Sequence, residues 1–461
     1  MLSSSRKESY STREELSQSL YMHDAACRVV ARLIKERDDA KAALSDLKVS
    51  AISGPAPAAA PGAGGAEKKR DRDESAGAPA KVPKSGMTKE VIEKMVTTAG
   101  ALSKGRRKKP LPEGLVPPET LKTSDYGLVG KFPLHTTSGP TRGITAVDYD
   151  HVSGGFAVTG GVDGKFRIFD CEQKKAASLG VKAHAKAVTC AKFLGPSSGE
   201  DLASISLVGT CSADKTCKVW KRGDASAKGF AYDCAYTLSD HESDCVGLDR
   251  QASGDYLVTF GKEGSWIFYD LAEGLRLATT QADAGVSFTC GSFHPDGLIL
   301  GTGTGSGDVL VWDVKEQKGV ATFEGHKAAI SALSFSENGY YLATASCDHS
   351  EGVKLWDLRK LKNFQTIDLG GLTGGQKLGK KPPKVVANFD RSGAYLGVGC
   401  GQSVQIFGSK QSWSPILEEE AGWSDVPGTT TKGASCLCFG NLAKNVFVGS
   451  NSDHNLRVYG L

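Results

Sequence analysis

The sequence predicts an all-β protein built as a seven-bladed propeller, because one motif recurs seven times and glycine is abundant. From about residue 125 onward, seven apolar runs each close on an aromatic residue. These are Phe169, Trp220, Tyr269, Trp312, Trp356, Phe407 and Tyr459. Successive members lie 43 to 52 residues apart, which accommodates four strands per unit, and the Trp-Asp endings are typical of WD repeats. Glycine accounts for 56 of 461 residues, which suits short strands and tight turns.

The repeating unit is clearest at 326–357. A first strand is expected at Ile330–Phe335, and a turn at 337–339 leads into a second strand at Tyr341–Ser346. A third strand follows at Val353–Trp356. Because the sheet faces of such a unit are apolar, it is stable only when stacked between neighbouring units.

Each unit also carries polar residues that we expect to form a buried hydrogen-bonded set. The set combines a His before the first strand, a hydroxyl in the second, an Asp in the next turn and a Trp in the third. The candidates are His326, Thr344 or Ser346, Asp348 and Trp356, and His184, Asp214 and Trp220 repeat the pattern. His, Asp and a hydroxyl also resemble a hydrolase triad. A catalytic site is made once, whereas this set recurs, so we assign it a structural role and identify no catalytic residue.

The seventh unit ends with the chain at Leu461, directly after its third strand. It therefore lacks an outer strand unless another segment supplies one. The β-like stretch Tyr126–His135 precedes the first unit and is the candidate. We expect it to close the ring, because closure by both ends of the propeller removes exposed sheet edges.

Residues 10–49, after a short remnant at 1–9, are predicted to form one long helix. Apolar or tolerated residues recur at alternating spacings of four and three. They are Leu16, Leu20, His23, Cys27, Val30, Ile34 and, after two polar positions, Leu44. This heptad seam indicates a coiled coil. A single apolar stripe does not stabilise an isolated helix, so we expect self-association or packing with partner helices, with docking on the chain's own propeller as the alternative.

Two further segments precede the propeller, which we place at 125–461. Residues 50–86 are rich in Pro, Ala, Gly and charge, and are expected to be a disordered linker. Residues 87–124 hold a short helix at about 88–103, a basic cluster and a Pro-rich stretch. The cluster consists of Lys104, Arg106, Arg107, Lys108 and Lys109. A nuclear-import signal, a phosphate-contacting patch and ordinary solvated charge are open interpretations of it.

Composition and motifs exclude several classes of function. Lys plus Arg total 56 against 52 Asp plus Glu, a net charge of +4, which is too even for a sequence-specific nucleic-acid binder. The 12 cysteines form no C-x-x-C pair, so reduced buried thiols of an intracellular protein are expected, and no metal site. No secretory signal or membrane-length apolar run is found. The near match to a phosphate loop at 374–381 lacks the required hydroxyl and following helix, so no cofactor is expected.

Several long runs resemble the pre-mRNA-processing factor 19 family. They are Tyr21–Leu33 in the predicted helix, Arg106–Val116 before the propeller, and Phe293–Ile299, Phe335–Ala345 and Leu355–Phe364 within it. WD repeats in general share only scattered positions. Runs of this length, in the same order over nearly the whole chain, are far more specific than the fold.

The resemblance implies a nuclear, spliceosome-associated scaffold, with a link to DNA repair, that forms a homotetramer through its coiled coil. Its propeller would bind splicing-complex proteins or substrates. The family is also a ubiquitin ligase, in which an N-terminal U-box docks the ubiquitin-conjugating enzyme. Only about ten residues precede the predicted helix here, so no residue inherits that role. Either the chain is truncated or this version acts without a U-box, and a ligase whose U-box is missing by truncation is the alternative function. An unrelated WD-repeat adaptor is the second alternative.

Overall fold

A computed structural model describes the propeller and the segment that leads into it. The described residues are 87–108, 110–122, 126–135, 143–178, 180–195, 207–226, 229–370, 384–401, 403–416, 433–451 and 453–461. The predicted coiled-coil helix at 10–49, the linker at 50–86 and the rejected phosphate loop at 374–381 lie outside these ranges.

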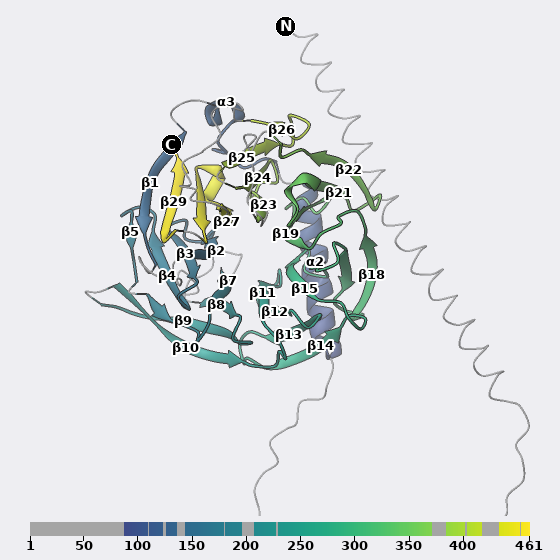
Figure 1. Cartoon of the computed structure of the whole chain (residues 1–461). Helices are drawn as coiled ribbons and strands as arrows, with labels where there is room; N and C mark the ends of the chain where they lie inside the picture. Colours follow the sequence, from purple (N-terminus) through teal and green to yellow (C-terminus); the bar gives the residue numbers. More distant parts are fainter. Residues whose placement is uncertain are drawn as a thin grey trace, which may run out of the picture. The chain divides into compact units, whose positions relative to one another are not determined.

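Seven antiparallel sheets form the propeller in the described part of the chain (Figure 1), so the predicted fold is confirmed. Blade 1 holds β2 (Ile144–Tyr149), β3 (Phe156–Gly161), β4 (Lys165–Asp170), β5 (Lys175–Ala176) and β6 (Val181–Lys182). Blade 2 holds β7 (Val188–Phe193), β8 (Leu207–Ser212), β9 (Cys217–Ser226) and β10 (Gly229–Leu238). Blade 3 holds β11 (Cys245–Arg250), β12 (Tyr256–Gly261), β13 (Ser265–Asp270) and β14 (Arg276–Gln281). Blade 4 holds β15 (Phe288–Phe293), β16 (Ile299–Thr304), β17 (Val309–Asp313) and β18 (Lys318–Phe323); blade 5 holds β19 (Ile330–Phe335), β20 (Tyr341–Ser346), η2 (His349–Glu351), β21 (Val353–Asp357) and β22 (Lys362–Ile367). Blade 6 holds β23 (Val385–Phe389), β24 (Tyr395–Cys400), β25 (Ser403–Gly408) and β26 (Ser414–Pro415); blade 7 holds β27 (Ala434–Phe439), η5 (Asn441–Ala443), β28 (Asn445–Ser450), β29 (Asn455–Gly460) and β1 (Gly127–Pro133).

The first strands of the blades surround the centre of the ring, and each contacts the first strand of the next blade. Hydroxyl side chains on these strands donate hydrogen bonds to backbone carbonyls of the following blade. The donor and acceptor pairs are Thr145 to Val188, Thr189 to Cys245, Ser331 to Val385 and Ser435 to Ile144. The last pair joins blade 7 to blade 1, so hydrogen bonds between blades also close the ring at its centre.

The second strand of each blade lies between neighbouring blades and is buried along most of its length, as β16 shows. Glycine permits the close approach that this packing needs. A Cβ atom added to Gly303 would lie only 2.6 Å from Ile330 Cγ2 of blade 5. Packing of blade 4 against blade 5 therefore accounts for Gly303 and also for Gly301, where an added Cβ atom would meet Phe335.

Blade 7 is completed by a strand from the other end of the propeller. β1 pairs antiparallel with β29, with Phe132 opposite Leu456 and Pro133 opposite Asn455. Figure 1 shows the blue β1 beside the yellow β29. The prediction that Tyr126–His135 closes the ring is confirmed, and the outer edge of blade 7 is paired.

A strap formed by residues 87–122 lies across one face of the propeller, which we call the strap face. Its first part is α2 (Lys89–Lys108), which buries Met95 completely in an apolar cluster that includes Tyr256 of blade 3. Lys94 Nζ lies 3.0 Å from Asp255 Oδ2 in the neighbouring turn. The helix is therefore fixed to the propeller by an apolar side chain and an ion pair at the surface.

The second part of the strap passes over blades 6 and 7. The backbone N–H of Val116 donates to the carbonyl of Leu442 at 3.1 Å, and the short helix α3 (Pro118–Leu121) buries Leu121 in the core shared by these blades. The Tyr126 hydroxyl then donates to the carbonyl of Ala443 at 2.8 Å, just before β1 begins. The strap is thus continuous with the strand that closes the ring.

The structure corrects the sequence prediction for the basic cluster. The helix does not end near residue 103 but runs on to Lys108, so Arg106 lies on its last turn. The Arg106 guanidinium donates to the carbonyl of Pro295, and its Nε lies 3.9 Å from Glu337 Oε1. Only 13% of its side chain is exposed. Arg106 therefore holds the strap on blades 4 and 5, and is not part of a freely exposed basic run.

Candidate partner-binding surface

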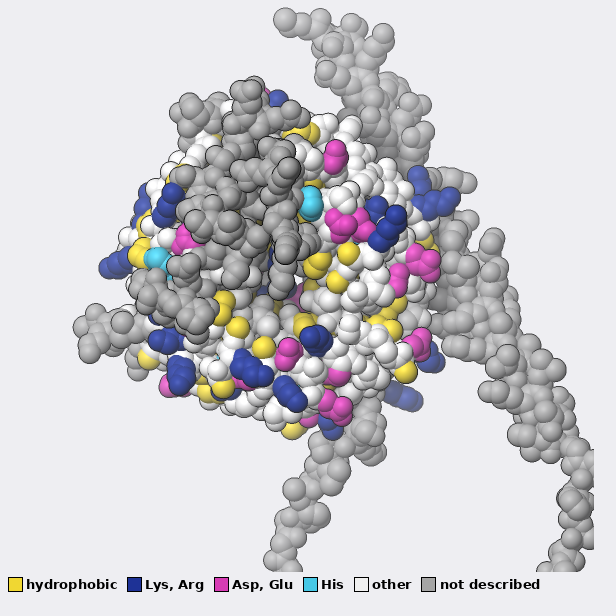
Figure 2. Space-filling view, in the orientation of Figure 1, with side chains coloured by type: hydrophobic (Ala, Val, Ile, Leu, Met, Phe, Trp, Pro, Cys, Tyr) yellow, Lys and Arg dark blue, Asp and Glu magenta, His cyan; other side chains and the backbone are white. Residues whose placement is uncertain are grey.

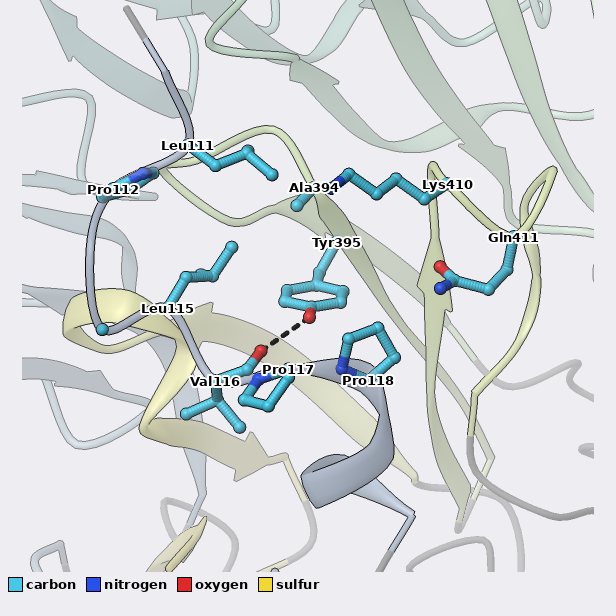
Figure 3. Close-up of a pocket in the computed structure, with 11 residues that line it drawn as sticks. Leu111, Pro112, Leu115, Val116, Pro117, Pro118, Ala394, Tyr395, Lys410 and Gln411 are labelled. Carbon is cyan, nitrogen blue, oxygen red and sulfur yellow. Dashed lines mark hydrogen bonds between the residues drawn. The ribbon is translucent and has the colours of Figure 1, made fainter. Parts of the chain in front are cut away.

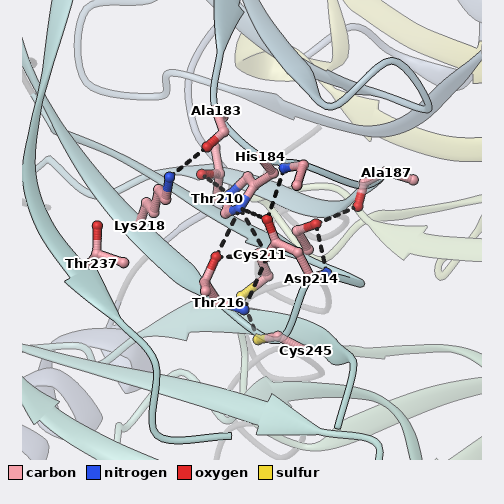
Figure 4. Close-up of polar contacts among 12 residues, drawn as sticks. Ala183, His184, Ala187, Thr210, Cys211, Asp214, Thr216, Lys218, Thr237 and Cys245 are labelled. Atoms are coloured by element: carbon pink, nitrogen blue, oxygen red, sulfur yellow. Dashed lines mark hydrogen bonds and ion pairs between the residues drawn. The ribbon is translucent and has the colours of Figure 1, made fainter.

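The predicted polar set of blade 2 is assembled inside the blade (Figure 4). His184 Nδ1 lies 3.1 Å from Asp214 Oδ2, and His184 Nε2 lies 2.8 Å from Thr210 Oγ1. Trp220 Nε1 donates to the same hydroxyl at 2.9 Å. Burial lowers the pKa of His184, although Asp214 opposes this, and the contacts fit a neutral imidazole with its proton on Nδ1. The ring nitrogens and the hydroxyl are all partnered, so this set has no group free for catalysis.

Blade 5 repeats this arrangement. His326 Nε2 lies 3.0 Å from Thr344 Oγ1, and Trp356 Nε1 donates to that hydroxyl at 2.8 Å. Of the two hydroxyls considered from the sequence, Thr344 is therefore the member of the set. Ser346 instead bonds to the backbone carbonyl of Ala328 at 3.4 Å.

The prediction that Asp348 completes the set of blade 5 was wrong. His326 Nδ1 lies 3.0 Å from Glu351 Oε2, and burial is the largest cause of the lowered pKa of this histidine. Asp348 accepts a hydrogen bond from the backbone N–H of Ser350 at 3.0 Å and caps η2. The physical reason is the longer turn of this blade, because η2 moves the Asp outward and brings Glu351 to the histidine.

Blades 1 and 3 contain related sets that the sequence analysis missed. The members are His135, Thr159 and Asp163 in blade 1, and His241, Thr259 and Glu263 in blade 3. In these blades the third strand closes on Phe169 or Tyr269, so the Trp that draws attention to the pattern is lacking. A His shortly before the first strand, followed by a Thr inside the second, is the signal that finds all four sets.

Beside the strap, a groove opens between the chain at 110–118 and blade 6 (Figure 3). The strap contributes Leu111, Leu115, Pro117 and Pro118, and blade 6 contributes Lys410 and Gln411. Tyr395 lies between the two sides, and its hydroxyl donates to the carbonyl of Val116 at 2.6 Å. This part of the groove has a volume of about 240 Å³. Its strap wall is apolar and includes Leu111, which is 43% exposed.

The groove continues toward blade 5 as a second hollow of about 270 Å³, which carries positive charge. Arg391 and Lys410 line it and are exposed, and neither forms an ion pair with any residue that the structure describes. Glu337 also lines this hollow and is near Arg106. An exposed apolar wall beside two unpaired cations is a surface suited to an acidic protein segment.

The face turned to the viewer in Figure 2 differs from the groove in the distribution of its charged side chains. Basic and acidic side chains are interspersed along its rim. A mixed rim generates no extended field of one sign, which is what association with nucleic acid through phosphate groups requires. The visible surface therefore offers charge of both signs to partners.

Comparison with known proteins places the chain in a family. The Prp19/Pso4-like family model matches residues 3–47, and the WD domain, G-beta repeat model matches residues 131–170, 176–221 and 317–357. Pre-mRNA-processing factor 19 homolog 2 of Arabidopsis thaliana is 39% identical over 98% of this chain and 79% of its own length. The chain belongs to the pre-mRNA-processing factor 19 family. The resemblance seen in the sequence is thereby confirmed.

Two further family members agree with this assignment. Pre-mRNA-processing factor 19 of Oryza sativa subsp. japonica is 38% identical over 98% of the chain and 79% of its own length. The human protein of that name is 39% identical over 99% of the chain and 82% of its own length. These alignments span the predicted helix, the strap and the propeller alike.

No helix within the described ranges is long and apolar enough to cross a membrane. Among the same residues, no group of three or more His, Cys, Asp or Glu is placed to hold a metal ion. The coiled-coil seam from Leu16 to Leu44 and Lys109 of the basic cluster lie outside the described ranges, whereas Lys104 is exposed on α2.

Proposed function

We propose that this chain is a scaffold subunit of a nuclear, splicing-associated protein complex, and that partner proteins bind its propeller in the groove beside the strap. The names of its relatives, which refer to pre-mRNA processing, support the complex. The observation that carries the binding site is the positive charge of Arg391 and Lys410, which form no ion pair with a residue that the structure describes, next to the exposed Leu111. A partner segment with carboxylates beside an apolar residue complements both features.

Self-association through residues 10–49 completes the proposal. The heptad seam and the family match over residues 3–47 support it, and a homotetramer is the state that the family resemblance implies. Sedimentation of the full chain should give four times the mass of one chain. Replacing Leu20 and Ile34 with Lys should yield monomers that keep a folded propeller, because both residues belong to the predicted seam and neither belongs to the propeller sequence at 125–461. An unchanged mass after this double substitution would contradict the proposed seam.

The splicing role is tested by removing the protein from a nuclear extract of its own organism. Splicing of a reporter pre-mRNA should fall, and the purified full chain should restore it. A chain with Arg391→Glu and Lys410→Glu should restore it poorly, because partner segments no longer find positive charge. Undiminished splicing after complete depletion would refute the proposed role. Full restoration by the double variant would refute the groove alone.

A further inference from the structure

Three thiols meet between blades 2 and 3, away from the groove. Cys211 on β8 and Cys217 on β9 are opposite each other in the strand register, and Cys245 is the first residue of β11. All three are buried, with at most 1% of each residue exposed. They belong to one apolar cluster, so they are screened from bulk solvent by the packing of the two blades.

The sulfur atoms of Cys211 and Cys245 are unusually close. Their Sγ atoms lie 2.8 Å apart (Figure 4). Two sulfurs in ordinary van der Waals contact are farther apart than this, and a disulfide bond measures about 2.05 Å. The two sulfurs therefore need to approach by less than about 1 Å to reach bonding distance.

The two thiols also differ in acidity. Burial raises the pKa of Cys245, but hydrogen bonds with Cys211 and His241 outweigh it, and the net pKa is lowered. Burial raises the pKa of Cys211 well above its usual value. The lowered pKa of Cys245 beside the raised pKa of Cys211 suits a nucleophile and a resolving thiol.

We propose that hydrogen peroxide converts Cys211 and Cys245 into a disulfide that links blade 2 to blade 3. The Cys245 thiolate attacks one peroxide oxygen, the O–O bond breaks, and the departing hydroxide takes up a proton to become water. Cys245 is now a sulfenic acid. The Cys211 sulfur attacks the sulfenic sulfur, the S–O bond breaks, and the hydroxide leaves as water with the Cys211 proton. One peroxide is reduced to two waters, and two thiols are oxidised to one disulfide.

Other fates of the cluster are less well supported by its geometry. A metal would draw the three thiols and His241 together, but no such group is arranged to hold a metal within the described residues. A bond between Cys211 and Cys217 would link two strands that are already paired within blade 2. The Cys211–Cys245 bond instead joins two blades that are otherwise held by packing and hydrogen bonds, so it would raise the stability of the oxidised ring.

The test treats the purified full chain with hydrogen peroxide, blocks remaining thiols with N-ethylmaleimide and analyses the unreduced digest by mass spectrometry. A peptide pair linked through Cys211 and Cys245 should appear, with loss of both thiol hydrogens, and dithiothreitol should separate it. Exposed Cys234 serves as the internal measure of peroxide exposure. Buried Cys400 serves as the control for a thiol without a sulfur neighbour, and should remain reduced.

Two results would overturn the proposal. One is full oxidation of Cys234 while Cys211 and Cys245 are still recovered as free thiols. The other is a linked pair containing Cys217 in place of Cys245. Because the readout uses the unmodified chain, it does not depend on a variant that folds. A Cys245→Ala chain, where it folds, should also lose the several-degree rise in melting temperature that peroxide gives the unmodified chain.

Discussion

The interior of blades 2 and 5 and the groove beside the strap use polar side chains in opposite ways. Inside the blades, His184 and His326 each have a hydroxyl on one ring nitrogen and a carboxylate on the other. In the groove, Arg391 and Lys410 face solvent with no acidic partner in the described part of the chain. The buried sets recur from blade to blade, whereas the groove occurs where the strap meets blades 5 and 6.

This difference distinguishes the residues that hold the fold from the residues that are available to a partner. A buried polar group that lacks a partner costs free energy, so sets that recur inside the blades must be internally satisfied. A surface that binds a partner must instead keep groups available, and an unpaired charge in solvent costs little. Repetition with internal pairing therefore marks residues that hold the fold, and unpaired charge at one place marks residues that meet a partner.

The largest expected effect comes from the strand that closes the ring. Deleting residues 126–135 removes β1 and leaves the edge of β29 unpaired. We expect loss of cooperative thermal unfolding for the whole propeller, because each blade is stable only between two neighbours. Circular dichroism during heating measures this. Deletion of 53–62, a stretch of equal length in the predicted linker, is the control and should leave the melting curve unchanged. Similar melting curves for the two deletions would contradict the role of β1 in closing the ring.

The second-largest expected effect is a loss of stability when the buried polar set of blade 2 is disrupted. Thr210→Val keeps the shape of the side chain but removes the hydroxyl shared by His184 and Trp220. We expect a loss of about 2–4 kcal/mol in the free energy of unfolding, since two buried donors or acceptors are left unpaired. Denaturant titration measures the change. Thr210→Ser retains the hydroxyl and should lose much less; equal losses would show that the methyl group matters and not the hydrogen bonds.

Acidification should weaken the buried sets of blades 1, 2 and 5 by a smaller amount, whereas the raised pKa of His241 excludes the set of blade 3 from this effect. Burial lowers the pKa of His135, His184 and His326, so the folded state binds a proton less readily than the unfolded state. Stability contributed by these neutral rings is complete above the unfolded pKa of about 6.5 and is lost as the pH falls toward the folded values. The melting temperature should fall between about pH 7 and pH 5. The His184→Asn chain should be less stable at neutral pH, and its melting temperature should depend less steeply on pH. A steeper dependence would contradict the assignment of a neutral ring to His184.

The smallest expected effect on stability belongs to the groove. Arg391→Glu with Lys410→Glu changes two exposed side chains that have no described ion pair to lose. The free energy of unfolding should change by no more than about 0.5 kcal/mol. The matched control reverses Lys175 and Lys182, which are exposed on blade 1. A large loss of stability in the groove variant alone would place its cations among the structural residues.

Much of the fold was accessible from the sequence, because it repeats. The aromatic endings of the blades and the stretch at Tyr126–His135 predicted both the ring and its closure. The predicted carboxylate partner of His326 was wrong, because one additional short helix, η2, changes which acidic residue reaches the imidazole. The docking of α2 was not predicted, because it depends on burial of Met95 against blades 3 and 4, which follow it far along the sequence.

The groove could not be predicted for a related reason. Its apolar wall comes from the strap near Leu111, and its cations come from turns of blade 6 nearly three hundred residues later. Neither stretch has a motif of its own. Only the folded chain brings the exposed apolar wall and the two exposed cations together.

The central claim is that the groove beside the strap binds partners while the buried sets hold the fold. Its most direct test is the recovery of identified splicing-complex proteins on the purified Arg391→Glu, Lys410→Glu chain, relative to the Lys175→Glu, Lys182→Glu control. The account predicts that both chains melt at the same temperature and that the groove variant recovers about tenfold less of at least one such protein. Equal recovery by the two folded variants would contradict it.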